Sequence, residues 1–69
     1  MITLEQSVAR DLPMAKNTEN YMRMVKAFSY TDSIEQLNGL AVLYGLDMSY
    51  DRADICLALH TVETAKGWH

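Results

Sequence analysis

The sequence has a single cysteine, Cys56, and therefore no internal disulfide bond. Secreted domains as small as this 69-residue chain usually depend on disulfides, because a core of this size leaves only about 3–5 kcal/mol of net stability. We therefore expect a reducing, cytoplasmic location. No basic start followed by an apolar stretch marks a signal peptide, and the longest apolar run, Leu40–Leu46, is far shorter than the roughly 20 residues that cross a bilayer. The sequence predicts a soluble protein with no membrane partner.

Motifs for catalysis or cofactor binding are also missing. The three glycines are isolated from one another, so the chain has no glycine-rich phosphate loop. Cys56 and His60 have a spacing that places two side chains on one face of a helix. However, a structural zinc site needs four ligands, and a thiol–imidazole dyad needs an orienting group and an oxyanion site. We expect no enzyme activity, no metal and no cofactor.

Basic residues are scarce after Lys26. Residues 1–26 carry a net charge of +1 and residues 27–69 a net charge of −4, for a total of −3 at pH 7. Soluble helical surfaces normally mix charges of both signs. A small domain with so acidic a second half repels nucleic acid and attracts basic surfaces.

Two segments in the first half have the pattern of helices. A capping-box pattern at Thr3 opens a first helix, which Pro13 ends near residue 12. A second helix is expected from residue 17 or 18 to Ser29, because its apolar residues share one face and its charged residues lie opposite.

The third predicted helix opens near residue 31, capped by Asp32 or Ser33, and ends at Gly45, which is expected as a left-handed C-terminal cap. Its second half is apolar nearly all round, which is typical of a central, buried helix. The stretch Leu40–Met48 is the one segment that could instead form a buried strand.

The fourth predicted helix opens at Asp51 as its N-cap, with Tyr50 and Ile55 spaced as a hydrophobic staple, and Gly67 ends it. The sequence therefore predicts an all-α fold, a small bundle of about four short helices that forms a single domain over residues 1–69.

The third and fourth segments have the order of a DNA-reading helix-turn-helix. Such a motif places the first residues of its second helix on base edges, and here Arg52 is surrounded by the acids Asp47, Asp51 and Asp54. These carboxylates would repel phosphates. A DNA-binding or regulatory module, dimeric and using the bases of the first half, remains the alternative, and its candidate bases are Arg10, Lys16, Arg23 and Lys26. A helical adaptor that forms a stable homodimer is a third interpretation.

The short length, acidic second half and lack of enzyme motifs resemble the small anti-CRISPR proteins of phages and mobile elements. This resemblance is one of whole-chain profile, and no residue motif is carried over. Several of those proteins occupy a basic nucleic-acid channel of a CRISPR surveillance complex, some as mimics of duplex DNA. The resemblance implies such a complex as partner and the cytoplasm of a bacterial host as the place of action.

We therefore expect a non-catalytic inhibitor whose acidic surface occupies a basic site on a nucleic-acid-binding protein, without binding nucleic acid itself. The acids and their neighbouring tyrosines are the candidate contacts, with the tyrosines as rigid anchors. Acids at helix starts are also favoured by the helix dipole, so a merely solvated acidic face stays open as an alternative. The predicted partner-binding residues are Asp32, Glu35, Asp47, Asp51, Asp54, Glu63, Tyr30 and Tyr50.

Overall fold

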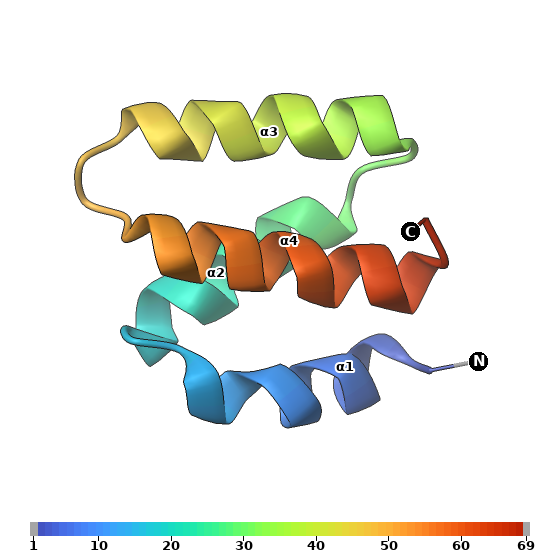
Figure 1. Ribbon diagram of the computed structural model, residues 1–69. Helices are drawn as coiled ribbons and strands as arrows, with labels where there is room; N and C mark the ends of the chain where they lie inside the picture. Colours follow the sequence, from blue (N-terminus) through green and yellow to red (C-terminus); the bar gives the residue numbers. More distant parts are fainter. Residues whose placement is uncertain (1, 69) are drawn as a thin grey trace.

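The computed structural model describes residues 2–68 and consists of four α-helices (Figure 1). The helices are α1 (Leu4–Asp11), α2 (Thr18–Ser29), α3 (Ile34–Leu46) and α4 (Arg52–Lys66), with a short 3-10 helix at Leu12–Met14. No strand occurs between residues 2 and 68, so the all-α prediction is confirmed. The strand alternative for residues 40–48 is wrong, because most of that stretch belongs to α3.

Local capping signals determine where each helix starts. Thr3 accepts from the Gln6 amide, and Gln6 reaches back to the Thr3 amide, which completes the predicted capping box. Ser33, rather than Asp32, caps α3 by accepting from the amide of Gln36. Asp51 caps α4 as predicted, by accepting from the amide of the second helical residue.

Helix α4 occupies the centre of the molecule. In Figure 1 it runs between α3 above and α1 below, with α2 behind, and it packs against all three. The main core lies between α2 and α4, where side chains from both helices are buried together with Leu37 of α3. The buried hydrophobic residues are Tyr21, Met24, Val25, Phe28, Leu37, Ile55, Ala58 and Val62.

Helix α3 is an outer element, so its predicted central position is wrong. Leu37 is its one buried residue, whereas Val42, Leu43 and Leu46 are exposed. Small buried side chains, such as Ala58, let other helices pack closely on α4. Because α1 and α2 both pack on α4, no other helix covers the outer side of α3.

The predicted cap at Gly45 is also wrong. Helix α3 continues through this glycine to Leu46, and Gly67 is the only residue with a positive φ, 71°, between residues 2 and 68. The chain instead reverses at Asp47, whose carboxylate accepts from the Ser49 amide at 2.9 Å and whose carbonyl accepts from the Tyr50 amide at 3.2 Å. This side-chain turn replaces the left-handed glycine cap.

Gly67 ends α4 in the left-handed conformation, as predicted. Its amide and that of Trp68 both bond back to the last turn of the helix. Of the helices that the structure describes, none is long and apolar enough to span a bilayer.

Candidate protein-binding surface on helix α3

Four of the predicted acids lie along one edge of the molecule. This α3 edge, defined as residues 32–51, comprises α3 and its two flanking loops, and it forms the top of Figure 1. It contains four carboxylates and no lysine or arginine, and all four acids are exposed. They form two groups, with Asp32 and Glu35 near the start of α3 and Asp47 and Asp51 beyond its end. At 1.5 Å per residue, Glu35 and Asp47 lie about 18 Å apart.

Asp54 does not belong to this surface, so its prediction as a partner contact is wrong. It is 1% exposed, and its two carboxylate oxygens accept from the backbone amides of Lys16 (2.8 Å) and Asn17 (2.9 Å). The carboxylate therefore ties the start of α4 to the loop before α2. The sequence could not reveal this, because the amides that it binds are 37 and 38 residues away.

The exposed acids differ in how far the protein itself uses them. Asp51 caps α4 and lies 3.7 Å from the Lys16 ammonium, so its charge is partly balanced. The hydrogen bond from the Ser49 amide lowers the pKa of Asp47 below its ordinary value, so this exposed carboxylate stays ionised to a lower pH than an ordinary aspartate. Glu63 lies on α4, outside the α3 edge, and is half-buried.

The two predicted tyrosines have different surroundings. Tyr30 caps the end of α2 and is 75% exposed, so its ring is available to a partner. Tyr50 is half-buried, and its ring packs edge-on against Tyr44 with a centroid distance of 4.8 Å. Its hydroxyl is the main cause of the raised pKa of Arg23. Tyr50 therefore stabilises the fold, and Tyr30 alone suits the role of an anchor.

An exposed apolar strip lies on the second half of α3 and on Met48 just beyond it, and sequence reasoning missed it. Val42 and Leu43 are each 63% exposed, Leu46 is 74% exposed, and Met48 is 95% exposed. The signal was the nearly all-round apolar character of α3, which also fits a buried helix. Large exposed apolar side chains that gather on one element are typical of interaction sites in soluble proteins.

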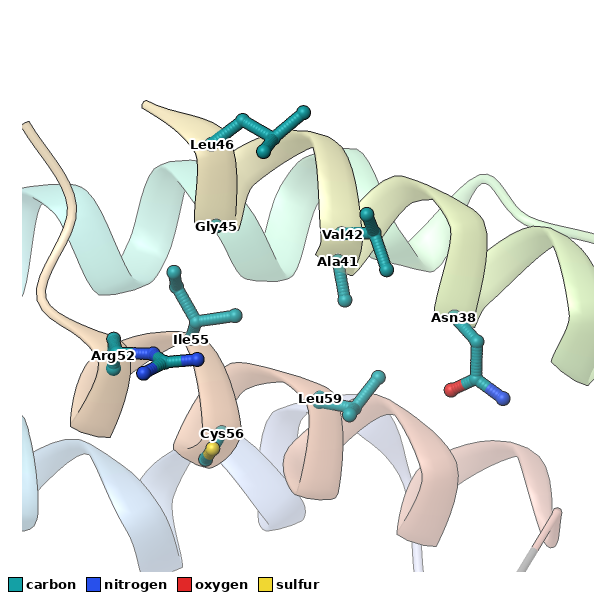
Figure 2. Close-up of a pocket in the computed structure, with 9 residues that line it drawn as sticks. All are labelled: Asn38, Ala41, Val42, Gly45, Leu46, Arg52, Ile55, Cys56 and Leu59. Atoms are coloured by element: carbon teal, nitrogen blue, oxygen red, sulfur yellow. The ribbon is translucent and has the colours of Figure 1, made fainter. Parts of the chain in front are cut away.

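Two residues of the apolar strip, Val42 and Leu46, line an open groove between α3 and α4 of about 540 Å³ (Figure 2), whereas Leu43 lines a separate hollow beside Tyr44 and Asp47. In the figure, Ala41 points from α3 toward α4, and Ile55 and Leu59 point back from α4. Arg52 is the one charged residue among those that line the groove. The lining residues are Asn38, Ala41, Val42, Gly45, Leu46, Arg52, Ile55, Cys56 and Leu59.

A second groove, of about 800 Å³, lies between α1 and α2. Its floor is apolar, with residues such as Val8, Met22 and Val25, and its rim carries two acids and two bases. This balanced rim indicates no preference for the charge of a partner, in contrast to the α3 edge.

A buried polar cluster joins α1, α2 and α4. Asp11 is 1% exposed and accepts from the Arg10 guanidinium at 2.8 and 3.0 Å and from the Thr61 hydroxyl at 2.7 Å. Because that hydroxyl donates to Asp11, the Tyr21 hydroxyl, 2.8 Å away, donates to Thr61. His60 lies at the outer side of the cluster, with Nδ1 3.6 Å from the Asp11 carboxylate. Among residues 2–68, no three metal-ligating side chains are grouped to hold an ion.

Comparisons with protein-family models, with curated proteins and with solved structures found no match to this chain.

Proposed function

We propose that this protein is a non-catalytic binding protein that uses the α3 edge to occupy a basic site on a nucleic-acid-binding partner. One observation carries the proposal. The α3 edge presents four exposed carboxylates and an exposed apolar strip, and residues 32–51 contain no lysine or arginine.

The mechanism is competition for the partner's basic site. Nucleic-acid-binding sites are lined by lysine and arginine. Because these side chains neutralise the phosphates, they supply much of the affinity for nucleic acid. Carboxylates held on a rigid helix edge pair with the same side chains, and the apolar strip and Tyr30 add contact area that phosphates lack. The profile shared with anti-CRISPR proteins makes the basic DNA channel of a CRISPR surveillance complex, in a bacterial cytoplasm, the first partner to test.

Direct binding to DNA receives less support from the arrangement of the bases. Arg10 is paired with Asp11, Lys16 with Asp51, and Arg23 with Glu19. These three were candidates for phosphate contacts, and each now faces a carboxylate. The start of α4, which would have to enter the major groove, presents Asp51 beside Arg52.

The proposal is tested by competition with DNA. Partners recovered by pull-down from bacterial lysates are incubated with fluorescent duplex DNA, and displacement of the DNA by this protein is measured at low and high salt. We expect displacement that weakens as salt rises, because exposed charges are screened beyond about 10 Å at 0.1 M. The double variant Glu35→Gln with Asp47→Asn should compete about five- to tenfold less well.

The matched control is Glu5→Gln, which removes one exposed charge from α1, far from the α3 edge. Competition that is unchanged in the double variant, or reduced equally by Glu5→Gln, would show that the α3 acids are only a solvated face. Direct titration with duplex DNA completes the test, because saturable binding of this protein to DNA would favour the helix-turn-helix alternative.

A further inference from the structure

We propose that the hollow at the end of α3 binds the guanidinium group of an arginine side chain from the partner's basic site. This inference rests on the proposed function for its partner class and adds the side chain that the partner supplies. The hollow has a volume of about 330 Å³ and lies where the chain leaves α3 for α4 (left in Figure 1). It is lined by Leu40, Leu43, Tyr44, Asp47 and Tyr50.

The charge of the lining favours a cation. Asp47 is the one charged residue among those that line the hollow, and it is exposed. Its carboxylate accepts from the Ser49 amide at 2.9 Å, which holds it in place. Because a carboxylate has about four acceptor sites, it can also accept from a cation. A phosphate or a carboxylate in the hollow would be repelled.

The end of α3 strengthens this preference. The carbonyl groups in the last turn of a helix carry partial negative charge, which basic residues nearby offset. Arg10, Lys26 and Lys66 occupy the last turns of α1, α2 and α4, whereas the last turn of α3 has no basic residue. The carboxylate of Asp47 instead follows directly after that turn and adds to the negative potential. A cation from a partner would therefore be stabilised both by Asp47 and by the end of the helix.

The aromatic lining favours arginine among the cations. The rings of Tyr44 and Tyr50 meet edge-on, 4.8 Å apart, and Tyr44 also packs at 5.5 Å on the buried ring of Phe28. These contacts fix both tyrosines, so Tyr50 receives a side chain of the partner rather than inserting into the partner. Tyrosine rings attract cations, and the planar guanidinium both stacks on such rings and pairs with a carboxylate through two hydrogen bonds. The lysine ammonium is more strongly hydrated and lacks this geometry.

Other cations do not fit the hollow as well. Arg23 of this chain interacts with the Tyr50 hydroxyl from α2, but it pairs with Glu19 at 3.1 Å and does not line the hollow. A calcium or magnesium ion takes about six or more oxygen ligands, and the lining offers one carboxylate. The volume is near the lower limit for small-ligand pockets, which suits a single side chain.

The test is a nuclear magnetic resonance titration with a blocked glycine–arginine–glycine tripeptide. Amide chemical shifts of the isotopically labelled protein are recorded with this peptide and with two matched peptides. One contains lysine, and the other contains citrulline, the neutral analogue of arginine. We expect saturable shift changes at residues 40–50 with a dissociation constant of about 1–10 mM for the arginine peptide. Binding should be at least about threefold weaker for lysine and undetectable for citrulline.

Matched variants locate the site. Asp47→Asn should weaken binding of the arginine peptide about fivefold, because asparagine can still accept from the Ser49 amide but has no charge. Asp32→Asn is the control, since it removes an exposed carboxylate of the same α3 edge outside the hollow. Tyr50→Leu should weaken binding about threefold, and Tyr50→Phe, which keeps the ring, should leave it unchanged. Circular dichroism confirms that each variant is folded.

Several results would overturn the inference. These are equal binding of the arginine and citrulline peptides, no saturable change up to about 50 mM, and equal effects of Asp47→Asn and Asp32→Asn. Tighter binding of lysine would contradict the assignment of a guanidinium. Shift changes in the hollow that depend on protein concentration without peptide would assign it to a second copy of this chain.

The titration contains no DNA, so its outcome is independent of the competition experiment. Arginine binding by a protein that displaces no DNA would refute the proposed function and leave the assignment of the hollow standing. Displacement of DNA by a protein whose hollow binds no arginine peptide would refute only the assignment of the hollow.

Discussion

Single buried carboxylates connect segments that lie far apart in the sequence. Asp54 is the clearest case, because both of its oxygens accept from the backbone before α2. We expect Asp54→Ala to lower the free energy of unfolding by about 2–4 kcal/mol, since two amides lose a charged acceptor. Urea titration followed by circular dichroism measures this loss. In a domain with about 3–5 kcal/mol of stability, this loss should leave the variant only marginally stable at room temperature.

Asp51→Ser is the control for Asp54→Ala. Serine keeps the N-cap of α4 and removes only a partly exposed charge, so its cost should stay below about 1 kcal/mol. If Asp51→Ser lowered the free energy of unfolding as much as Asp54→Ala, the effect of Asp54 would come from its charge at the start of the α4 dipole, and not from its bonds to the loop before α2.

Asp11 makes the stability depend on pH. Hydrogen bonds from Arg10, and then from Thr61, lower the pKa of Asp11 below its ordinary value, although burial opposes them. A carboxylate with a lowered pKa in the folded state stabilises the fold above its unfolded pKa of about 3.9, and this contribution is lost as the pH falls through the lower, folded value. We expect the melting temperature of the wild type to decrease as the pH drops below about 4. Asp11→Asn should be less stable at pH 7, but its melting temperature should decrease less as the pH drops. Parallel curves for the two proteins would exclude this role.

At the scale of the helices, two glycines of opposite conformation give opposite predictions. Gly45 is in the last turn of α3 with open space around it, so Gly45→Ala should raise the free energy of unfolding, by at most about 0.5–1 kcal/mol. Gly67 has a φ of 71°, so Gly67→Ala should lower it by about 1 kcal/mol. Thermal unfolding of both variants distinguishes the helical glycine from the cap. Destabilisation by Gly45→Ala would contradict the continuation of α3 through this position.

The sequence predicted the helices well because their end signals are local. The caps at Thr3, Asp51 and Gly67 act within four residues of the groups that they bond, so each can be recognised without knowledge of the fold. The prediction of a cap at Gly45 was wrong because a glycine can occupy either a helix or a left-handed cap, and its identity alone does not distinguish the two. The turn chemistry of Asp47, two residues later, ends the helix instead.

At the scale of the whole molecule, charge sets the expected oligomeric state. The net charge of −3 at pH 7 and the acidic α3 edge oppose self-association through the apolar strip. We expect a monomer by sedimentation equilibrium at about 20 mM salt, where the screening length exceeds the distance between the two acidic groups. Any weak dimer should appear only near 0.5 M salt. A dimer that is stable at low salt would show that apolar contact outweighs this repulsion and would support the homodimeric adaptor interpretation.

The candidate surface was only partly predictable for a related reason. Counting charges along the chain identified the sign of the surface, because Asp32, Glu35 and Asp47 remain exposed in the fold. It could not separate them from Asp54, whose burial depends on the packing of α4 against the loop before α2. The apolar strip was missed because its exposure depends on which helices pack against α3. An apolar pattern in the sequence does not show which helix faces a given side chain.

The polar cluster between α1 and α4 has a consequence for how these helices fit together. Ser7 and Asp11 are one turn apart on α1, and both bond to Thr61, the serine hydroxyl donating to its carbonyl at 2.8 Å and the carboxylate accepting from its hydroxyl. A purely apolar seam would keep similar contacts after a slide of one turn, about 5.4 Å. Here the same slide would leave the Ser7 hydroxyl and the Asp11 carboxylate buried without their hydrogen bonds to Thr61. We therefore infer a single register of α1 on α4. Thr61 thus fixes the position of α1 along the axis of α4.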